Sequence, residues 1–208
     1  YKGTLAGIDG SGLGAAIVAF EKIEEVLGKA MSYAQLLFAA DMGDAERGRF
    51  QQAIHERVTD ISSDLLFFTL ELNRLDDNVL EKKLSDPAAG HYRSWVRDVR
   101  VYRPHQLGDD IEQLLLEKSV SGKAAWVRLF EETFADMRFS LDGKSLTLSD
   151  TLNMLSDKDG EQRKKAAKVL GEVLGNHQRL FALITNTLAK DKEIEDTWRK
   201  YPRPVSSR

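Results

Sequence analysis

The sequence predicts a mainly α protein: an irregular multi-helix bundle with one small β-hairpin near residues 138-148. Three observations support this fold class. Apolar residues recur at steps of three and four over long stretches, which is the period of one helix face. Alternation of apolar and polar residues is confined to the segment around Asp142 and Gly143. The sequence has no repeat of fixed period, so a regular helical solenoid is not supported.

The first two predicted helices are long and form an antiparallel pair. One runs over residues 13–33, after a glycine-rich start, and the other over 44–73. The turn Asp41-Met42-Gly43-Asp44 separates them and supplies an N-cap carboxylate to the second helix. We expect the second helix to bury one stripe, formed by Phe50, Ile54, Val58, Ile61, Leu65, Phe68 and Leu72. The glycine-rich start lacks the preceding strand and the Gly-Lys-Ser/Thr ending of a phosphate loop.

Four shorter helices follow, each opened by a capping or helix-breaking residue. They are predicted over residues 77–84, 88–101, 109–118 and 122–136. Residues 138–148 then alternate between apolar and polar around Asp142-Gly143, which is the strongest short-range signal for a hairpin. One hairpin therefore interrupts an otherwise helical chain.

The segment over residues 160–201 predicts a long helix with one buried face. Its apolar stripe consists of Ala166, Leu170, Val173, Leu174, His177, Phe181, Ile184 and Leu188. Because His177 falls inside this stripe, we expect it to be hydrogen-bonded and structural. The polar residues on the other faces occur in an order that packing alone does not require: Asn186, Thr187, Lys190, Asp191, Lys192, Asp196, Trp198 and Arg199.

Composition indicates a soluble protein of 208 residues, with 42% hydrophobic and 30% charged residues. The formal net charge of -3 does not favour a general binder of polyanions. The chain has no cysteine, so thiol catalysis and thiolate metal sites are excluded, as suits a cytoplasmic location. No apolar run approaches the roughly 20 residues that span a bilayer, so we expect no membrane association.

No residue can be assigned a catalytic or metal-binding role by motif, and substrate-binding residues stay unknown. The one fragment similar to a zinc-protease helix is His55-Glu56-Arg57-Val58-Thr59, in which threonine stands where the second histidine ligand is required. No serine lies in a G-x-S-x-G elbow. The remaining histidines, His91, His105 and His177, lie far apart without a partner at helical spacing.

Four polar clusters have a structural interpretation that we favour over a functional one. The carboxylate pairs Asp76-Asp77 and Asp109-Asp110 lie at predicted helix starts, where negative charge favours the helix dipole. The basic run over residues 163–168 suits a solvated helix face. Residues 92–105 interleave aromatic and basic side chains, as proteins that bind single-stranded nucleic acid do, but they equally suit a helix that docks by its aromatic face. We therefore expect no nucleic-acid partner.

Five sequence blocks occur in an order that resembles the oligoendopeptidase F family. They are ELNRLDD (71–77), HYRSWVRDVRVYRPHQL (91–107), SGKAAWVRLFEE (121–132), RFSLDGKSLTLSDTL (138–152) and NTLAKDKEIEDTWR (186–199). This family belongs with the thimet-oligopeptidase-like zinc metallopeptidases. The resemblance implies a mostly helical peptidase that encloses a deep channel and cleaves short, unstructured peptides. It also implies a zinc ion held by an HExxH helix and a downstream glutamate.

The chain is similar to the amino-terminal and early middle part of that family only. The resemblance implies zinc in the parent enzyme. Because this chain contains no HExxH, we expect it to bind no zinc and to be inactive alone. Its expected partners are the missing carboxyl-terminal catalytic region and, in the parent enzyme, short peptide substrates. A start without Met and an end at PRPVSSR agree with an excised piece.

The predicted organisation is an amino-terminal helical lobe over residues 1-136, followed by residues 137-208, the hairpin plus the long helix that leads into the catalytic region. The two parts could pack as one unit. The predicted function is a non-catalytic lobe that forms part of the wall of the substrate channel. The alternative is a free-standing helical binding or scaffold module without enzymatic activity.

Overall fold

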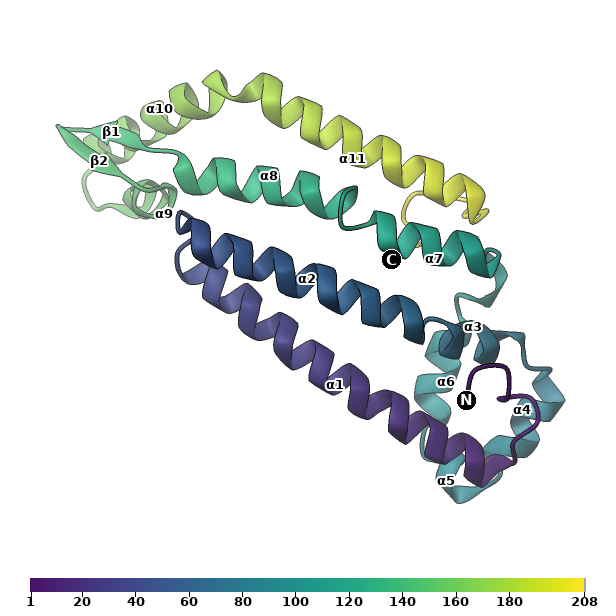
Figure 1. Ribbon diagram of the computed structural model, residues 1–208. Helices are drawn as coiled ribbons and strands as arrows, with labels where there is room; N and C mark the ends of the chain where they lie inside the picture. Colours follow the sequence, from purple (N-terminus) through teal and green to yellow (C-terminus); the bar gives the residue numbers. More distant parts are fainter. Residues whose placement is uncertain (208) are drawn as a thin grey trace.

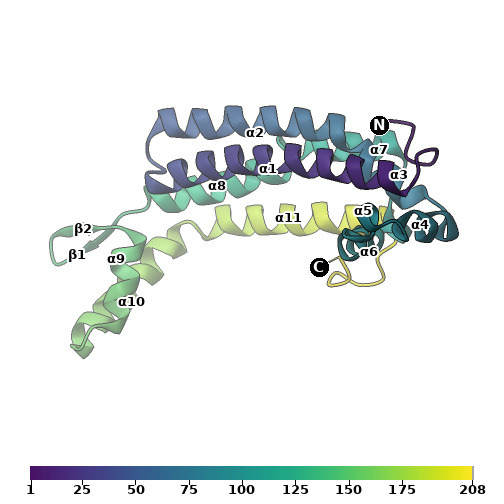
Figure 2. The same ribbon diagram turned by 90° about the horizontal axis from the view of Figure 1, so that it is seen from below.

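A computed structural model describes residues 1–207 and confirms the mainly α fold with one hairpin. Long helices run side by side along one axis, and shorter elements gather at both ends (Figures 1 and 2). The elements are α1 (Gly10–Ala40), α2 (Ala45–Leu65), α3 (Phe67–Arg74), α4 (Asp77–Leu84), α5 (Pro87–Gly90), α6 (Arg93–Arg100), η1 (Arg103–His105), α7 (Asp109–Lys118), α8 (Lys123–Asp136), β1 (Phe139–Leu141), β2 (Lys144–Leu146), α9 (Leu148–Asn153), η2 (Met154–Ser156), α10 (Gly160–Asn176) and α11 (Gln178–Trp198).

Helices α1 and α2 form the predicted antiparallel pair (Figure 1). Asp44 caps α2, because its carboxylate accepts hydrogen bonds from the N–H groups of Glu46 and Arg47. Helix α1 begins at Gly10 instead of residue 13, since the Asp9 carboxylate accepts from the N–H of Gly12 at 2.7 Å and allows the glycine-rich segment to be helical.

The prediction of one helix over residues 44–73 was wrong. The chain breaks at Leu66 into α2 and α3, and α3 directs Phe68 and Leu72 into a core at the amino-terminal end. The predicted stripe on α2 is also only partly covered: Phe50 is 40% exposed. The helices α7 and α8 run alongside α2 in Figure 1. Neither helix contains a buried residue, so they shield the apolar stripe of α2 from solvent only in part.

The main core joins the start of α1 to the short helices α3 to α6. Leu13 and Ile17 of α1 meet Phe68, Leu72 and Val96 there, and all five are almost fully buried. The predicted helix over 88–101 is split into α5 and α6 at His91 and Tyr92. The split lets α5 lie against α1 through Ala89 while α6 turns to bury Val96.

The predicted single helix over 160–201 is likewise two helices, which meet at His177. Its backbone leaves the helical region, with φ -103° and ψ 4°, and its Nδ1 lies 2.9 Å from the Val173 carbonyl oxygen, to which it donates. The change of direction lets α10 pack on the hairpin while α11 packs on α8. Only part of the expected stripe is buried as a result: Ala166, Leu170 and Ile184.

The hairpin lies where the sequence predicts it, with Phe139 opposite Leu146 in the antiparallel register. Its turn residues Asp142 and Gly143 have φ of 50° and 77°, the left-handed values that an Asp-Gly turn favours. Phe139 is fully buried with Met137 and Leu170 in a second, smaller core. The predictions for residues 77–84 and 109–118 are confirmed by α4 and α7.

Replacing Gly14 with alanine should destabilise the protein by about 1–3 kcal/mol. A Cβ at this position would lie 2.7 Å from the backbone carbon of Ala88, so α5 would have to move away from α1. The matched control is Gly28→Ala in the same helix, where a Cβ would meet nothing within 4 Å. That change should stabilise the protein by about 0.5–1 kcal/mol, because alanine is the better helix former. Urea denaturation of both variants measures the difference, and equal effects would contradict the packing described.

Candidate functional site: a cavity between α3, α6 and α11

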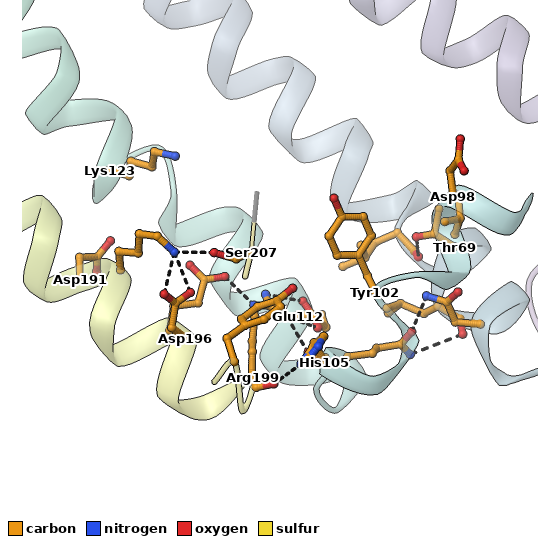
Figure 3. Close-up of a pocket in the computed structure, with 18 of the residues that line it drawn as sticks. Thr69, Asp98, Tyr102, His105, Glu112, Lys123, Asp191, Asp196, Arg199 and Ser207 are labelled. Carbon is orange, nitrogen blue, oxygen red and sulfur yellow. Dashed lines mark hydrogen bonds and ion pairs between the residues drawn. The ribbon is translucent and has the colours of Figure 1, made fainter. Parts of the chain in front are cut away.

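A cavity of about 1010 Å³ lies where the amino-terminal helices meet the last helix. Figure 3 shows Thr69, Asp98 and Tyr102 on one side of it, and Lys123, Asp191 and Asp196 on the other. Glu112, His105 and Arg199 lie between the two groups. The other lining residues are Leu66, Leu70, Asn73, Trp95, Val99, Gln106, Leu188, Ala189, Lys192, Glu195, Tyr201 and Ser207.

Four of the five blocks that carry the family resemblance meet at this cavity. The blocks over residues 71–77, 91–107, 121–132 and 186–199 all contribute lining residues. The block over 138–152, which contains the hairpin, does not. The order of polar residues in the last block thus has a structural explanation: Asp191, Lys192, Glu195, Asp196 and Arg199 all face the cavity.

Arg199 is the central polar residue of the site. Its guanidinium donates to both carboxylate oxygens of Glu112, at 2.7 and 2.9 Å, and its Nε donates to Glu195 at 2.7 Å. Glu112 also accepts the N–H of Leu107 at 2.8 Å. Such a paired arrangement combines two charge-assisted hydrogen bonds with a fixed geometry. It ties the end of α11 to the start of α7, which lies 87 residues earlier in the chain.

His105 adds a second connection between the same two segments. Its Nδ1 lies 2.7 Å from the carbonyl oxygen of Arg199, and its own carbonyl accepts from the Arg199 guanidinium at 3.3 Å. Because a carbonyl only accepts, Nδ1 carries a hydrogen here. The imidazole also stacks on the Tyr201 ring, with centroids 3.9 Å apart. His105 therefore has a structural role in the wall of the cavity.

Electrostatics in this cluster favour the ionised pair. Burial opposes the charge on Glu112, but the hydrogen bonds from Arg199 and from the Leu107 N–H outweigh it and lower the pKa of the Glu112 carboxyl. The hydrogen bond to Glu112 raises the pKa of Arg199, although burial opposes this. Burial raises the pKa of the Tyr201 phenol, while the charge of Arg199 acts in the opposite direction.

The side of the cavity formed by α8 and α11 carries further charges. Lys192 binds the Asp196 carboxylate at 2.7 and 2.9 Å and also contacts the hydroxyl of Ser207. Lys123 and Asp191 have no ion-pair partner within residues 1–207, and Figure 3 places both on this side. They are the charged groups of the cavity that remain available to a ligand.

Asn73 has a buried oxygen without a hydrogen-bond partner in the described part of the chain. The residue is 6% exposed, and its Nδ2 donates to Oε1 of Gln106 at 2.9 Å, while its Oδ1 has no donor. Buried polar atoms of this kind are uncommon and require an explanation. Sequence reasoning missed Asn73, because an asparagine near a helix end gives no separate signal.

Several polar residues of the clusters noted in the sequence cap helices or form hydrogen bonds and ion pairs within the chain. Asp76 caps α4, as expected. Asp77 accepts hydrogen bonds from both Arg100 and Arg103, and these bonds, with burial opposing, lower the pKa of its carboxyl. Arg100 also donates to the carbonyl oxygens of Leu72 and Leu75, at 2.7 and 3.0 Å. Aromatic residues of the block over 92–105 therefore pack against the core, and its arginines Arg100 and Arg103 form hydrogen bonds within the chain. This agrees with the expectation of a helix that docks by its aromatic face.

Within residues 1–207 no group of three or more His, Cys, Asp or Glu side chains is placed to hold a metal ion. The histidines that the sequence analysis considered, His55, His91, His105 and His177, are not brought together. None of the described helices is long and apolar enough to cross a membrane.

The stability that the Glu112 carboxylate contributes should be lost in acid. Because its folded pKa lies below the ordinary value of 4.5, the contribution is complete above that pH and decreases as the pH falls through the folded pKa. The variant Glu112→Gln keeps the shape but cannot lose a charge. The difference in unfolding free energy between wild type and variant should therefore be large at pH 7 and shrink at pH 3. A difference that does not change with pH would contradict this account of the pair.

Comparison with known proteins supports the resemblance described above. Residues 71–139 match the family model described as Oligopeptidase F. The crystal structure of oligoendopeptidase-F from Enterococcus faecium matches 99% of this chain with a TM-score of 0.83 and 21% identity. A structure from Chlamydophila abortus, provisionally named a peptidase, matches 96% of the chain with a TM-score of 0.61 and 17% identity. No curated protein matches by sequence.

This chain spans only 41% of the Enterococcus structure and 34% of the Chlamydophila structure. The resemblance to the oligoendopeptidase F family is thus confirmed in sequence for residues 71–139 and in fold for nearly the whole chain, which covers part of that structure only.

Proposed function

Since the chain resembles part of oligoendopeptidase F, we propose that it is the non-catalytic helical lobe of a zinc metalloendopeptidase that hydrolyses short peptides. The observation that carries the proposal is the coverage: nearly all of this chain matches, but it accounts for about two-fifths of the matched structure. A lobe of a larger enzyme would be expected to match that enzyme over nearly all of its own length and over only part of the enzyme's length. We propose that the parent enzyme is cytoplasmic and that its substrates are short peptides.

The residues of this chain do not fit a zinc centre of the family type, which needs two histidines one helical turn apart. Zinc in such enzymes lowers the pKa of a bound water and polarises the scissile carbonyl, beside a glutamate base. His55 has Thr59 at the position of the second ligand. The partner that supplies zinc and catalysis is the carboxyl-terminal region of the parent enzyme, and this chain is expected to be inactive alone.

The apolar side chains exposed on α8 and α11 support an interface with that region. Large examples on these two helices are Val127, Leu129, Phe130, Leu183, Ile194 and Trp198. Large apolar side chains exposed on two neighbouring helices suit an interaction site. We propose that residues 1-136 form the lobe, that residues 137-208 lead into the catalytic region, and that together they make part of the wall of an enclosed channel.

The native reading frame beyond Arg208 tests the proposal directly. A continuation through an HExxH segment with a downstream glutamate would support a peptidase lobe. A stop codon immediately after Arg208 would contradict it and would favour the free-standing helical binding module instead.

Removing this lobe from the intact enzyme should impair folding or allow longer peptides to be cleaved, because one wall of the channel would be lost. The measurement compares hydrolysis of peptides of increasing length by the complete and shortened enzymes. Circular dichroism and thermal unfolding of both proteins separate a folding defect from a change of selectivity. A shortened enzyme that is well folded and has unchanged size selectivity would contradict a role in the channel wall.

A further inference from the structure

We propose that the cavity between α3, α6 and α11 is an intramolecular docking site, which the segment directly following Arg208 covers in the parent protein. The existence of that segment rests on the proposed function, in which this chain is one lobe of a longer enzyme. Its place over the cavity rests on the structure: the path of the chain after α11, the apolar side chains on both walls of the cavity, and two charged groups without partners.

The chain reverses direction directly after α11. Lys200 has a φ of 59°, in the left-handed region, which is uncommon for a residue other than glycine. The N–H of Tyr201 donates to the carbonyl oxygen of Asp196 at 2.9 Å, the hydrogen bond that ends a helix at a left-handed residue. The hydroxyl of Ser207 then contacts Nζ of Lys192, which lies within the last two turns of α11. The chain after α11 therefore runs back along that helix.

The returning chain is held at the edge of the cavity. The Tyr201 ring stacks on the imidazole of His105, with centroids 3.9 Å apart. Tyr201 and Ser207 both line the cavity, and Figure 3 shows Ser207 on the same side as Asp191 and Asp196. The residues that come next in the parent protein start beside the cavity, so covering it requires no long connection.

Apolar side chains line both walls of the cavity. Leu66, Val99 and Tyr102 belong to the wall formed by the amino-terminal helices, and Leu188 and Ala189 belong to α11. Tyr102 is 51% exposed, and Ala189 is exposed as well. The interiors of folded proteins are packed too densely to leave a space of about 1010 Å³ between apolar walls. We therefore expect a further element of the protein to fill it.

The charged side chains favour a segment of the chain over a small molecule. Sites for small molecules present several polar groups that converge on the ligand. Here most charged lining residues already form ion pairs: Arg97–Asp98, Glu112–Arg199, Glu195–Arg199 and Lys192–Asp196. Among the described lining residues, Lys123 and Asp191 lack an ion-pair partner within residues 1–207. A segment with one acidic and one basic side chain beside apolar ones completes both pairs.

Single cysteines test the proposal, because the chain itself has none. Tyr102→Cys places a thiol in the wall of the cavity. Val101→Cys is the matched control, since Val101 is 64% exposed and does not line the cavity. Both variants are made in the chain 1–208 and in a chain lengthened by the next stretch of the native reading frame, about 30 residues or about 45 Å of helix. The measurement is the rate at which each thiol reacts with dithionitrobenzoate.

The Tyr102→Cys thiol should react at least about tenfold more slowly in the lengthened chain than in the chain 1–208, because a covered thiol reacts only when the segment opens. The Val101→Cys thiol should react at the same rate in both. Ala189→Cys decides the matter if Tyr102→Cys does not fold, since Ala189 is exposed on the opposite wall. It should show the same slowing.

Unchanged rates for the Tyr102→Cys and Ala189→Cys thiols in a lengthened chain that is folded by circular dichroism would overturn the inference. Protection that appears only in the complete enzyme would assign the cover to a later part of the protein and would overturn it too. If the lengthened chain does not fold, rapid reaction of the Tyr102→Cys thiol in the complete enzyme has the same meaning. A stop codon directly after Arg208 would contradict the lobe proposal as well, whereas the other results leave that proposal standing.

Discussion

The ion pair between Arg199 and Glu112 is the interaction on which the position of the last helix, α11, depends. The amino-terminal core is closed by its own apolar residues, but α7, α8 and α11 bury very few side chains. Apart from the contacts of Phe130 and Phe134 with Phe181, apolar packing gives these outer helices little support, and directional polar contacts contribute to their positions. Both side chains of the pair are less than one-fifth exposed, and the hydrogen bonds of His105 and Leu107 join the same network. Removing one partner of a pair this buried leaves a charge without compensation.

The way in which α11 is held also explains the cavity between α3, α6 and α11. Helix α11 is held at its end by Arg199 and farther along by the stacked rings of Phe134 and Phe181, whose centroids are 4.9 Å apart. Between these two points it does not close on α3 and α6, and polar side chains line the space that remains.

Sequence reasoning predicted the local elements well and their breaks poorly. Capping residues and the Asp-Gly turn act through neighbours in the chain, so α4, α7 and the hairpin were found close to their observed bounds. The break at Leu66 has no proline or glycine near it. Gly90 precedes the break at His91, and Gly175 lies two residues before the break at His177, but an isolated glycine does not by itself end a helix. All three breaks arise where a helix turns to reach a core formed by distant segments. The cavity could not be predicted from the sequence, because residues 73, 105, 112 and 199, which line it, are far apart in the chain. The family resemblance selected the right blocks without indicating that they meet.

A double-mutant cycle on Glu112 and Arg199 tests the central claim most directly. Unfolding free energies are measured for the wild type, Glu112→Gln, Arg199→Met and the double variant. The account predicts a coupling energy of about 1–3 kcal/mol, as found for residues in one hydrogen-bonded network. A coupling below about 0.5 kcal/mol, the size typical of exposed ion pairs, would show that the pair does not hold α11 in place and would contradict the account.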